Sequence, residues 1–354
     1  MKIKATIKIS TTLLLIFFLV FTSEILLAQS EKATECPFST SLHNTGEGMR
    51  YWYEEQGGFK TVTDIPYAEL DCQNCHIQTC GQCHTKKEDG TCAYSTDQAK
   101  QMETCLACHT RAKSTFGLTK KAGCLDVHIT NGMTCSDCHK GADVHGDGTF
   151  YHSMRDSGAV KASCAECHEP KEEEIRAHTV HNGKLDCAAC HISNSITCLN
   201  CHFDNFLKTG TRKGNFIAPC QNWVLLINYE GKITSGSVQT LLYKDQKFVA
   251  YAPYFTHAIQ SKGKVCTDCH ANEAVKLIKK NKKVPMAEFK EGQVVSYQGV
   301  VPLVPEQLHW PFFDKEGENW VPIKDDKAPI VQFTGHGTPL TAEQIKKMAQ
   351  PYKE

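Results

Sequence analysis

The sequence lacks long apolar runs, and it lacks an excess of charge of either sign. Its longest continuous apolar run near the N-terminus, residues 13–21, has nine residues, whereas a membrane-spanning helix needs roughly 20. Lysine plus arginine and aspartate plus glutamate are equal at 39 each, so the formal net charge is zero. This balance gives no argument for nucleic-acid binding, and the later sequence offers no span that would insert the mature chain into a membrane.

The N-terminus has the pattern of an export signal. Three lysines precede the short apolar run, and small residues near Ala28 and Ser30 follow it. We expect residues 1–28 to be a signal peptide and the mature protein to be periplasmic or secreted to the cell surface. An uncleaved membrane anchor is the alternative interpretation.

Two other cysteine patterns are also missing. Iron–sulfur proteins use runs such as C-x₂-C-x₂-C, which do not occur among the 20 cysteines of this chain. A tetrahedral zinc site needs two Cys-x-x-Cys pairs that converge, and zinc has no use for a histidine after every pair. A pure disulfide framework would not explain that histidine either.

The chain instead contains eight copies of Cys-x-x-Cys-His, which hold sixteen of its cysteines. Two thiols on one turn of backbone can bond one edge of a porphyrin, and the next residue places an imidazole on the iron. We therefore expect eight covalently attached haem c groups. The cysteines are Cys72, Cys75, Cys80, Cys83, Cys105, Cys108, Cys135, Cys138, Cys164, Cys167, Cys187, Cys190, Cys198, Cys201, Cys266 and Cys269. The motif histidines are His76, His84, His109, His139, His168, His191, His202 and His270.

Nine further histidines are candidates for the second axial position of these irons. Several lie shortly before a motif, from where they could reach the iron of a neighbouring haem. The interpretation as ligands is favoured for His128, His145, His152, His178, His181 and His257, which lie among the motifs. His43 and His309 complete the expected set. His336 is the histidine expected to be spare or to face a substrate; for any single histidine, an ordinary hydrogen-bonded role is the alternative.

Motif density predicts the organisation of the chain. Seven motifs lie within residues 72–202, about 19 residues for each, which leaves too little protein for an apolar core. We expect a mainly α and irregular, haem-packed fold with low regular secondary structure. The expected divisions are an N-terminal segment at 29–71, a haem-dense region at 72–220 and a C-terminal region at 221–354 that carries the eighth haem.

A few segments predict regular elements. Short runs rich in β-branched and aromatic residues at 223–229, 237–243 and 247–254 indicate a small antiparallel β-meander. "TCLACHTRAK" and "ASCAECHEPKEEEIRAH" predict helical turns, and the latter could continue as a helix to Gly183. "TAEQIKKMAQ" predicts a short helix that begins at a threonine cap.

Four cysteines belong to no motif: Cys36, Cys92, Cys124 and Cys220. In an oxidising compartment they would form two disulfides, in one of three pairings. The alternative is a thiolate beside an open haem, where it could bond a sulfur substrate. The basic run at 276–283 is either a solvated helix face or a docking site for an acidic redox partner.

From Cys72 to His270 the chain resembles the multihaem c-type cytochromes, specifically an octahaem member. The resemblance rests on the eight motifs and on "DVHITNGMTCSDCH" and "HTVHNGKLDCAACH", where a remote histidine precedes a motif. It implies closely stacked, mostly bis-histidine haems. Octahaem relatives include hydroxylamine oxidoreductase-like proteins, nitrite reductases and tetrathionate reductases. This chain departs from them in having no Cys-x-x-Cys-Lys and a long segment before its first motif.

These observations favour an exported electron carrier over an enzyme. Its partners would be other cytochromes or quinol-linked membrane complexes, with no nucleic acid and with an oligomeric state that the sequence leaves open. The alternative is a multihaem reductase or oxidase of a small nitrogen or sulfur compound, in which one haem keeps an open site. A haem-based sensor or a subunit of a surface filament is the third hypothesis.

Overall fold

The computed structural model describes residues 37–55, 57–70, 77, 79–88, 94–170, 175–210, 216–217, 223–291, 293–317, 319–325 and 327–352. The expected signal peptide and the first motif, with Cys72, Cys75 and His76, lie outside the described residues. So do the spare cysteines Cys36, Cys92 and Cys220.

Three consecutive strands form the predicted antiparallel meander, and this prediction is confirmed. They are β5 (Trp223–Tyr229), β6 (Lys232–Tyr243) and β7 (Gln246–Pro253), with β6 between the other two. The first five residues of β5 are all buried. A strand that is covered on both faces has such a continuous apolar sequence rather than an alternating one.

The sheet extends well beyond the meander. Within the described residues it has seven strands. β11 (Gly299–Pro302) pairs parallel with β5, and β15 (Ile330–Phe333) pairs parallel with β7. β3 (Cys198–His202) runs parallel to β6 on the edge opposite β7, beyond the stretch of β6 that pairs with β5, and β4 (Phe216–Ile217) runs antiparallel to β3. The expectation of a mainly α and irregular chain was therefore wrong, because distant segments add strands to both edges of the meander and give a mixed α/β fold.

The apolar core follows this sheet. Its largest fully buried side chains include Trp223, Tyr251 and Phe248, and complete burial of a side chain such as Leu225 stabilises the fold by about 1.5–3 kcal/mol. A second cluster joins Phe59 to Phe203 and Phe248, with ring centroids 4.6 Å and 5.2 Å from that of Phe59. Burial thus ties the segment around residue 59 to the sheet.

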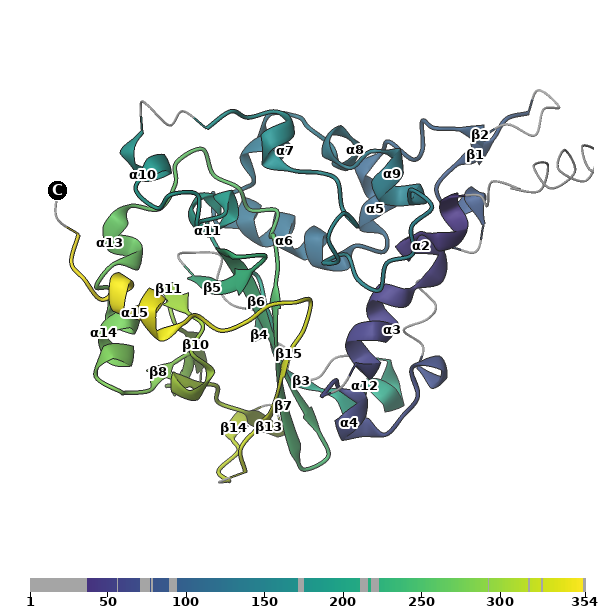
Figure 1. The fold of residues 1–354 in the computed structure, drawn as a ribbon. Helices are drawn as coiled ribbons and strands as arrows, with labels where there is room; N and C mark the ends of the chain where they lie inside the picture. The colour runs from purple at the N-terminus through teal and green to yellow at the C-terminus, as the bar shows by residue number, and fades with distance from the viewer. Residues whose placement is uncertain are drawn as a thin grey trace, which may run out of the picture.

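Short helices lie beside the sheet and carry most of the motifs (Figure 1). In chain order they are η4 (Cys80–Gln82), α5 (Met102–Leu106), α6 (Thr110–Lys121), α8 (Cys135–Cys138), η5 (Cys164–Glu166), α10 (Arg176–Thr179), α11 (Cys187–His191) and α13 (Cys266–Cys269). The helices predicted at "TCLACHTRAK" are confirmed. The continuous helix after Cys164 is wrong, because η5 ends at Glu166 and α10 begins only at Arg176.

The remaining helices include the capped one predicted near the C-terminus. α15 (Ala342–Met348) begins after Thr341, whose side chain accepts a hydrogen bond from the Gln344 amide. α12 (Phe203–Thr209) packs on β6, and α14 (Glu273–Lys279) packs on β11. The other described elements are η1 (Pro37–Thr40), α2 (Leu42–Thr45), α3 (Glu47–Glu54), α4 (Lys60–Thr63), η2 (Tyr67–Glu69), β1 (Thr85–Lys86), β2 (Tyr94–Ser95), α7 (Val127–Thr130), α9 (Gly141–His145), β8 (Val284–Pro285), β9 (Ala287–Lys290), β10 (Gln293–Ser296), η6 (Pro305–Gln307), β12 (Leu308–His309), β13 (Phe313–Glu316) and β14 (Asn319–Pro322).

The motif-rich segment has almost no apolar core of its own. In the described part of residues 79–186, Ala159 is the one apolar residue that is buried. Some large apolar side chains are instead exposed next to the expected haem-binding residues. Val265, directly before the motif cysteine Cys266, is 61% exposed. Val180, directly before the remote histidine His181, is 49% exposed. A segment of this length needs buried apolar surface to offset its conformational entropy. These residues therefore need an additional apolar partner to pack against.

No helix in the described part of the chain combines the length and the apolar character required to cross a bilayer.

The missing core leads to a prediction for the haem-free chain, produced without haem attachment. We expect the amides of β5, β6 and β7 to exchange slowly with deuterium, and those of residues 94–170 to exchange almost as fast as in an unfolded chain, because only the sheet has its own apolar core. Hydrogen–deuterium exchange with mass spectrometry measures both.

Leu225→Ala is the control, because it should cost about 2–5 kcal/mol of the sheet's stability and speed exchange in the sheet alone. Equal protection of the sheet and the motif-rich segment would contradict the prediction.

Candidate haem sites

Six described motifs share one local backbone geometry. In five of them the amide of the motif histidine donates to the carbonyl of the first cysteine at 2.8–2.9 Å, which closes one helical turn; in the sixth, the whole motif is helix α11. Side chains inside the motif support this turn. The Asp137 carboxylate accepts from the Thr134 amide at 2.6 Å, and the Asp268 carboxylate accepts from the Val265 amide at 2.9 Å. Both thiols and the imidazole are thereby placed on one turn.

Each of these six motif histidines faces a remote histidine. The ring centroids lie 5.9–6.3 Å apart in all six pairs. The pairs are His84 with His145, His109 with His43, His139 with His257, His168 with His128, His191 with His178 and His270 with His181.

This separation has the dimension of a metal bound between two imidazoles. A metal bonded to one nitrogen of each ring at about 2 Å places the two nitrogens about 4 Å apart, and the ring centroids lie further out, in the observed range. Other ring pairs, such as Phe116 and His257 at 5.9 Å, share this spacing. What distinguishes the six sites is that each pairs a motif histidine with a remote histidine. The residues of these six sites therefore fit a haem iron with two axial histidines.

The second ring nitrogen supports the same orientation. In metal sites, the ring nitrogen that does not bind the metal usually donates to a carbonyl or carboxylate. Nδ1 of His84, His191 and His43 is hydrogen-bonded to a main-chain carbonyl at 3.0–3.1 Å. Nδ1 of His139 is 3.1 Å from the Asp143 carboxylate, while Nδ1 of His128 is 3.2 Å from that of Asp126.

These contacts leave Nε2 of each ring for a metal. Burial also lowers the pKa of His43 and His181. A low pKa keeps the imidazole neutral near pH 7, which is the form that binds metal.

The six sites follow one another in space in the order of the sequence. The Cys83 thiol lies within electrostatic range of Cys105, and the Cys105 thiol is hydrogen-bonded to that of Cys135. Further along the chain, the Cys164 thiol is hydrogen-bonded to that of Cys187. Cys138 lies within electrostatic range of Cys167, as Cys190 does of Cys266. Each motif thus adjoins the next, and the motif at 187–191 adjoins the one at 266–270.

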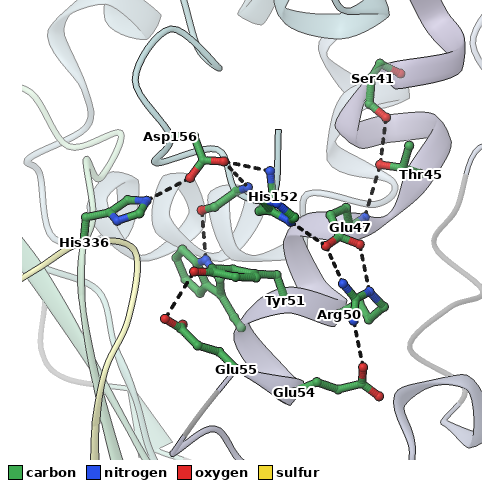
Figure 2. A network of polar contacts seen from close by, with 12 residues as sticks. Ser41, Thr45, Glu47, Arg50, Tyr51, Glu54, Glu55, His152, Asp156 and His336 are labelled. Carbon is green, nitrogen blue, oxygen red and sulfur yellow. Dashed lines mark hydrogen bonds and ion pairs between the residues drawn. The ribbon is translucent and has the colours of Figure 1, made fainter. Parts of the chain in front are cut away.

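His152 shares the Nδ1 pattern, although no histidine ring in the described part of the chain lies opposite it. Its Nδ1 is 2.9 Å from Glu47, within a polar network that starts on α3 (Figure 2). The Arg50 guanidinium, with His152 as a second partner, holds the pKa of the Glu47 carboxyl below its ordinary value. The rings beside His152 are those of Tyr51 and Phe150, with centroids at 5.2 Å.

The two C-terminal histidines lie apart from the six sites. His336 uses Nε2, the usual metal-binding nitrogen, for a 2.8 Å bond to Asp156 (Figure 2). This fits the expectation that His336 is spare. His309 lies on β12, and its side chain is exposed rather than opposite one of the six motif histidines.

The motif at Cys198–His202 does not fit the pattern. It lies in strand β3 rather than on a helical turn, and the ring opposite His202 belongs to Trp320, at 6.1 Å. The His202 Nε2 is 2.8 Å from the Phe313 carbonyl. The residues at this motif, as described, do not fit a bis-histidine haem.

Sequence reasoning missed the groups around the rings. Asp143 follows His139 by only four residues, but α8 ends before His139 and α9 begins after Lys140, so the closeness in sequence was the one available signal for this partner. Asp126 precedes His128 by two residues, a weaker signal of the same kind. The sequence did not predict Trp320 as the neighbour of His202, because nothing in the sequence connects β14 to the motif at β3.

Of the four spare cysteines, Cys124 alone is described. It follows α6, and its carbonyl accepts from the Gln260 side chain at 3.0 Å. Because Cys36, Cys92 and Cys220 lie outside the described residues, the two disulfides remain a prediction.

Comparison with known proteins gave no match: no protein-family model matches the sequence, and no curated protein or solved structure is significantly similar to it.

Proposed function

We propose that this chain is a multihaem c-type cytochrome that carries electrons through closely spaced bis-histidine haems. The observation that carries the proposal is the set of six histidine pairs, each with ring centroids 5.9–6.3 Å apart and one member inside a Cys-x-x-Cys-His motif. Four of these six motifs lie in residues 79–186, whose described part buries only one apolar residue. This lack of a core supports the proposal, because covalently attached porphyrins would supply the missing apolar surface.

The bound haem supplies one-electron chemistry at its iron, with a potential that axial ligands, hydrogen bonds and burial adjust. The protein's own residues hold it. The two cysteines of a motif would anchor it, the motif histidine and its remote partner would bind its iron, and carbonyls and carboxylates at Nδ1 orient the imidazole rings. Two protein ligands leave no axial position for a substrate, which favours an electron carrier over an enzyme at these six sites.

The spatial order of the motifs supports transfer along a series. Each motif of the six lies within hydrogen-bonding or electrostatic range of the next, from the motif at 80–84 to the motif at 266–270. Haems anchored to adjoining thiols would lie close to one another. Electrons would then pass from one end of the series to the other.

The compartment and the partners follow from the sequence. Haem attachment through Cys-x-x-Cys-His and the N-terminal signal pattern support a periplasmic or surface location, with other cytochromes or quinol-linked complexes as partners. The lysines at 276–283 follow the last motif, and Lys276, Lys279 and Lys280 are exposed. They would attract an acidic partner to that end of the series.

Removal of one remote histidine tests the proposal. We expect His257→Ala to convert one low-spin iron to a high-spin iron, because His257 is the ring opposite His139 and lies in a loop after β7. Electron paramagnetic resonance and optical spectra of the purified holoprotein measure the change, and added imidazole should restore the low-spin spectrum.

His309→Ala is the matched control, since His309 is exposed on β12, and its spectra should equal those of the wild type. If His257→Ala leaves every iron low-spin, His257 is not an axial ligand. If the wild-type protein carries no covalent haem by the pyridine haemochrome assay, the proposed function fails.

A second prediction concerns the carboxylate beside His139. We expect Asp143→Asn to raise the reduction potential of one haem, because a neutral amide polarises the imidazole less and removes a negative charge that stabilises the oxidised iron. A redox titration followed by absorbance measures the shift.

Asp147→Asn is the control. Asp147 carries the same charge but pairs with Lys161 at 2.7 Å instead of with a motif histidine. Equal shifts in both variants would mean that general charge, and not the hydrogen bond to His139, sets the potential.

A further inference from the structure

We infer that the Cys198–His202 motif does not form a bis-histidine haem site, unlike the six other described motifs. This inference rests on the proposed function, because it contrasts one motif with six that would hold bis-histidine haems. Four independent observations carry it: the backbone of the motif, the contacts of its histidine, the ring opposite that histidine and the burial of its side chains.

The backbone of the motif belongs to the sheet. Cys198 pairs with Gln239 and Cys201 with Leu241 on β6, with an irregularity between the two pairs. Asn200 lies at this irregularity with φ of +59°, and its amide donates to the Thr240 hydroxyl at 2.7 Å. Sheet pairing replaces the helical turn that places both thiols on one edge in the other motifs.

The metal-binding nitrogen of His202 is already engaged. Nε2 is 2.8 Å from the Phe313 carbonyl, which also accepts from the Asn200 side-chain amide at 3.1 Å. The Phe313 amide donates back to the Asn200 side-chain oxygen at 2.9 Å. Asn200 and His202 thus attach β13 to β3, whereas the Nδ1 contacts elsewhere leave Nε2 available.

In the six other sites a second histidine lies opposite the motif histidine. Opposite His202 lies the indole ring of a tryptophan instead. Trp320 on β14 lies with its ring centroid 6.1 Å from that of His202. β14 forms a hairpin with β13, so the hairpin that bonds to His202 also supplies this ring. An indole nitrogen carries a hydrogen and cannot serve as an axial ligand.

Burial gives the fourth contrast. Cys201 is 7% exposed and His202 is 6% exposed, whereas every other described motif cysteine is at least partly exposed and could carry a porphyrin at the surface. The cavity beside His202 is lined by charged side chains such as Asp204, Lys208 and Lys244, which do not suit the apolar face of a porphyrin.

Peptide mapping of the wild-type holoprotein tests the inference without any variant. After digestion, mass spectrometry should find haem on the peptides that contain the motifs at 80–84, 105–109, 135–139, 164–168, 187–191 and 266–270. The peptide that contains Cys198 and Cys201 should be found without haem. The six other peptides test the proposed function separately, since their lack of haem would refute that function and not this inference.

A pair of variants adds a spectroscopic readout. His202→Ala should leave the number of bis-histidine low-spin irons unchanged, whereas the matched variant His191→Ala should reduce it by one. Electron paramagnetic resonance counts these irons. A haem on the Cys198 peptide together with one high-spin iron would contradict the expected peptide map but uphold the inference, because that haem would not be bis-histidine. A haem on that peptide with every iron bis-histidine would overturn the inference.

Discussion

The structure depends on pairs of histidines that face each other across the space between short helices. Six pairs join residues as far apart as His43 and His109, or His139 and His257, and hold all twelve rings at nearly the same separation. Because the described part of residues 79–186 buries only one apolar side chain, ordinary packing cannot be what fixes these helices. A metal bound between the rings, within a covalently attached macrocycle, would provide both the bond and the apolar surface.

The sheet supplies the rigid support for this arrangement. His257 lies in the loop that follows β7, and so its position depends on a strand whose core residues are fully buried. Arg111 on α6 donates to the Ile196 carbonyl and to the Ser237 hydroxyl, both at 2.5 Å, and its guanidinium lies 3.9 Å from the centre of the Tyr254 ring. α6, which directly follows the motif at 105–109, is therefore attached to the sheet at a defined point, and rigid attachment holds that motif in a constant position.

Helices, caps and neighbouring strands could be predicted from the sequence, whereas pairing between residues far apart in the chain could not. The meander, the Thr341 cap and the helices around Cys105 follow from residues that are neighbours in the chain. The parallel strands β11 and β15 come from segments more than 70 residues from their partners, and no local signal announces such pairing. The same holds for the remote histidines. His128 lies seven residues before Cys135 but faces His168, because the fold, and not the spacing, selects the partner.

The Cys198–His202 motif shows that the Cys-x-x-Cys-His pattern alone does not determine the local structure of a motif. Its five residues follow the same pattern as the other motifs, but Asn200 pairs with Phe313 and the backbone joins β6, so the surroundings direct the same side chains to a different role. The spatial series of sites does not need this motif, because the Lys264 amide, two residues before Cys266, donates to the Cys190 carbonyl at 2.9 Å. Under the proposed function, electrons would pass from the motif at 187–191 to the motif at 266–270 without a step at His202. His202 instead holds the β13–β14 hairpin on the sheet through its bond to the Phe313 carbonyl.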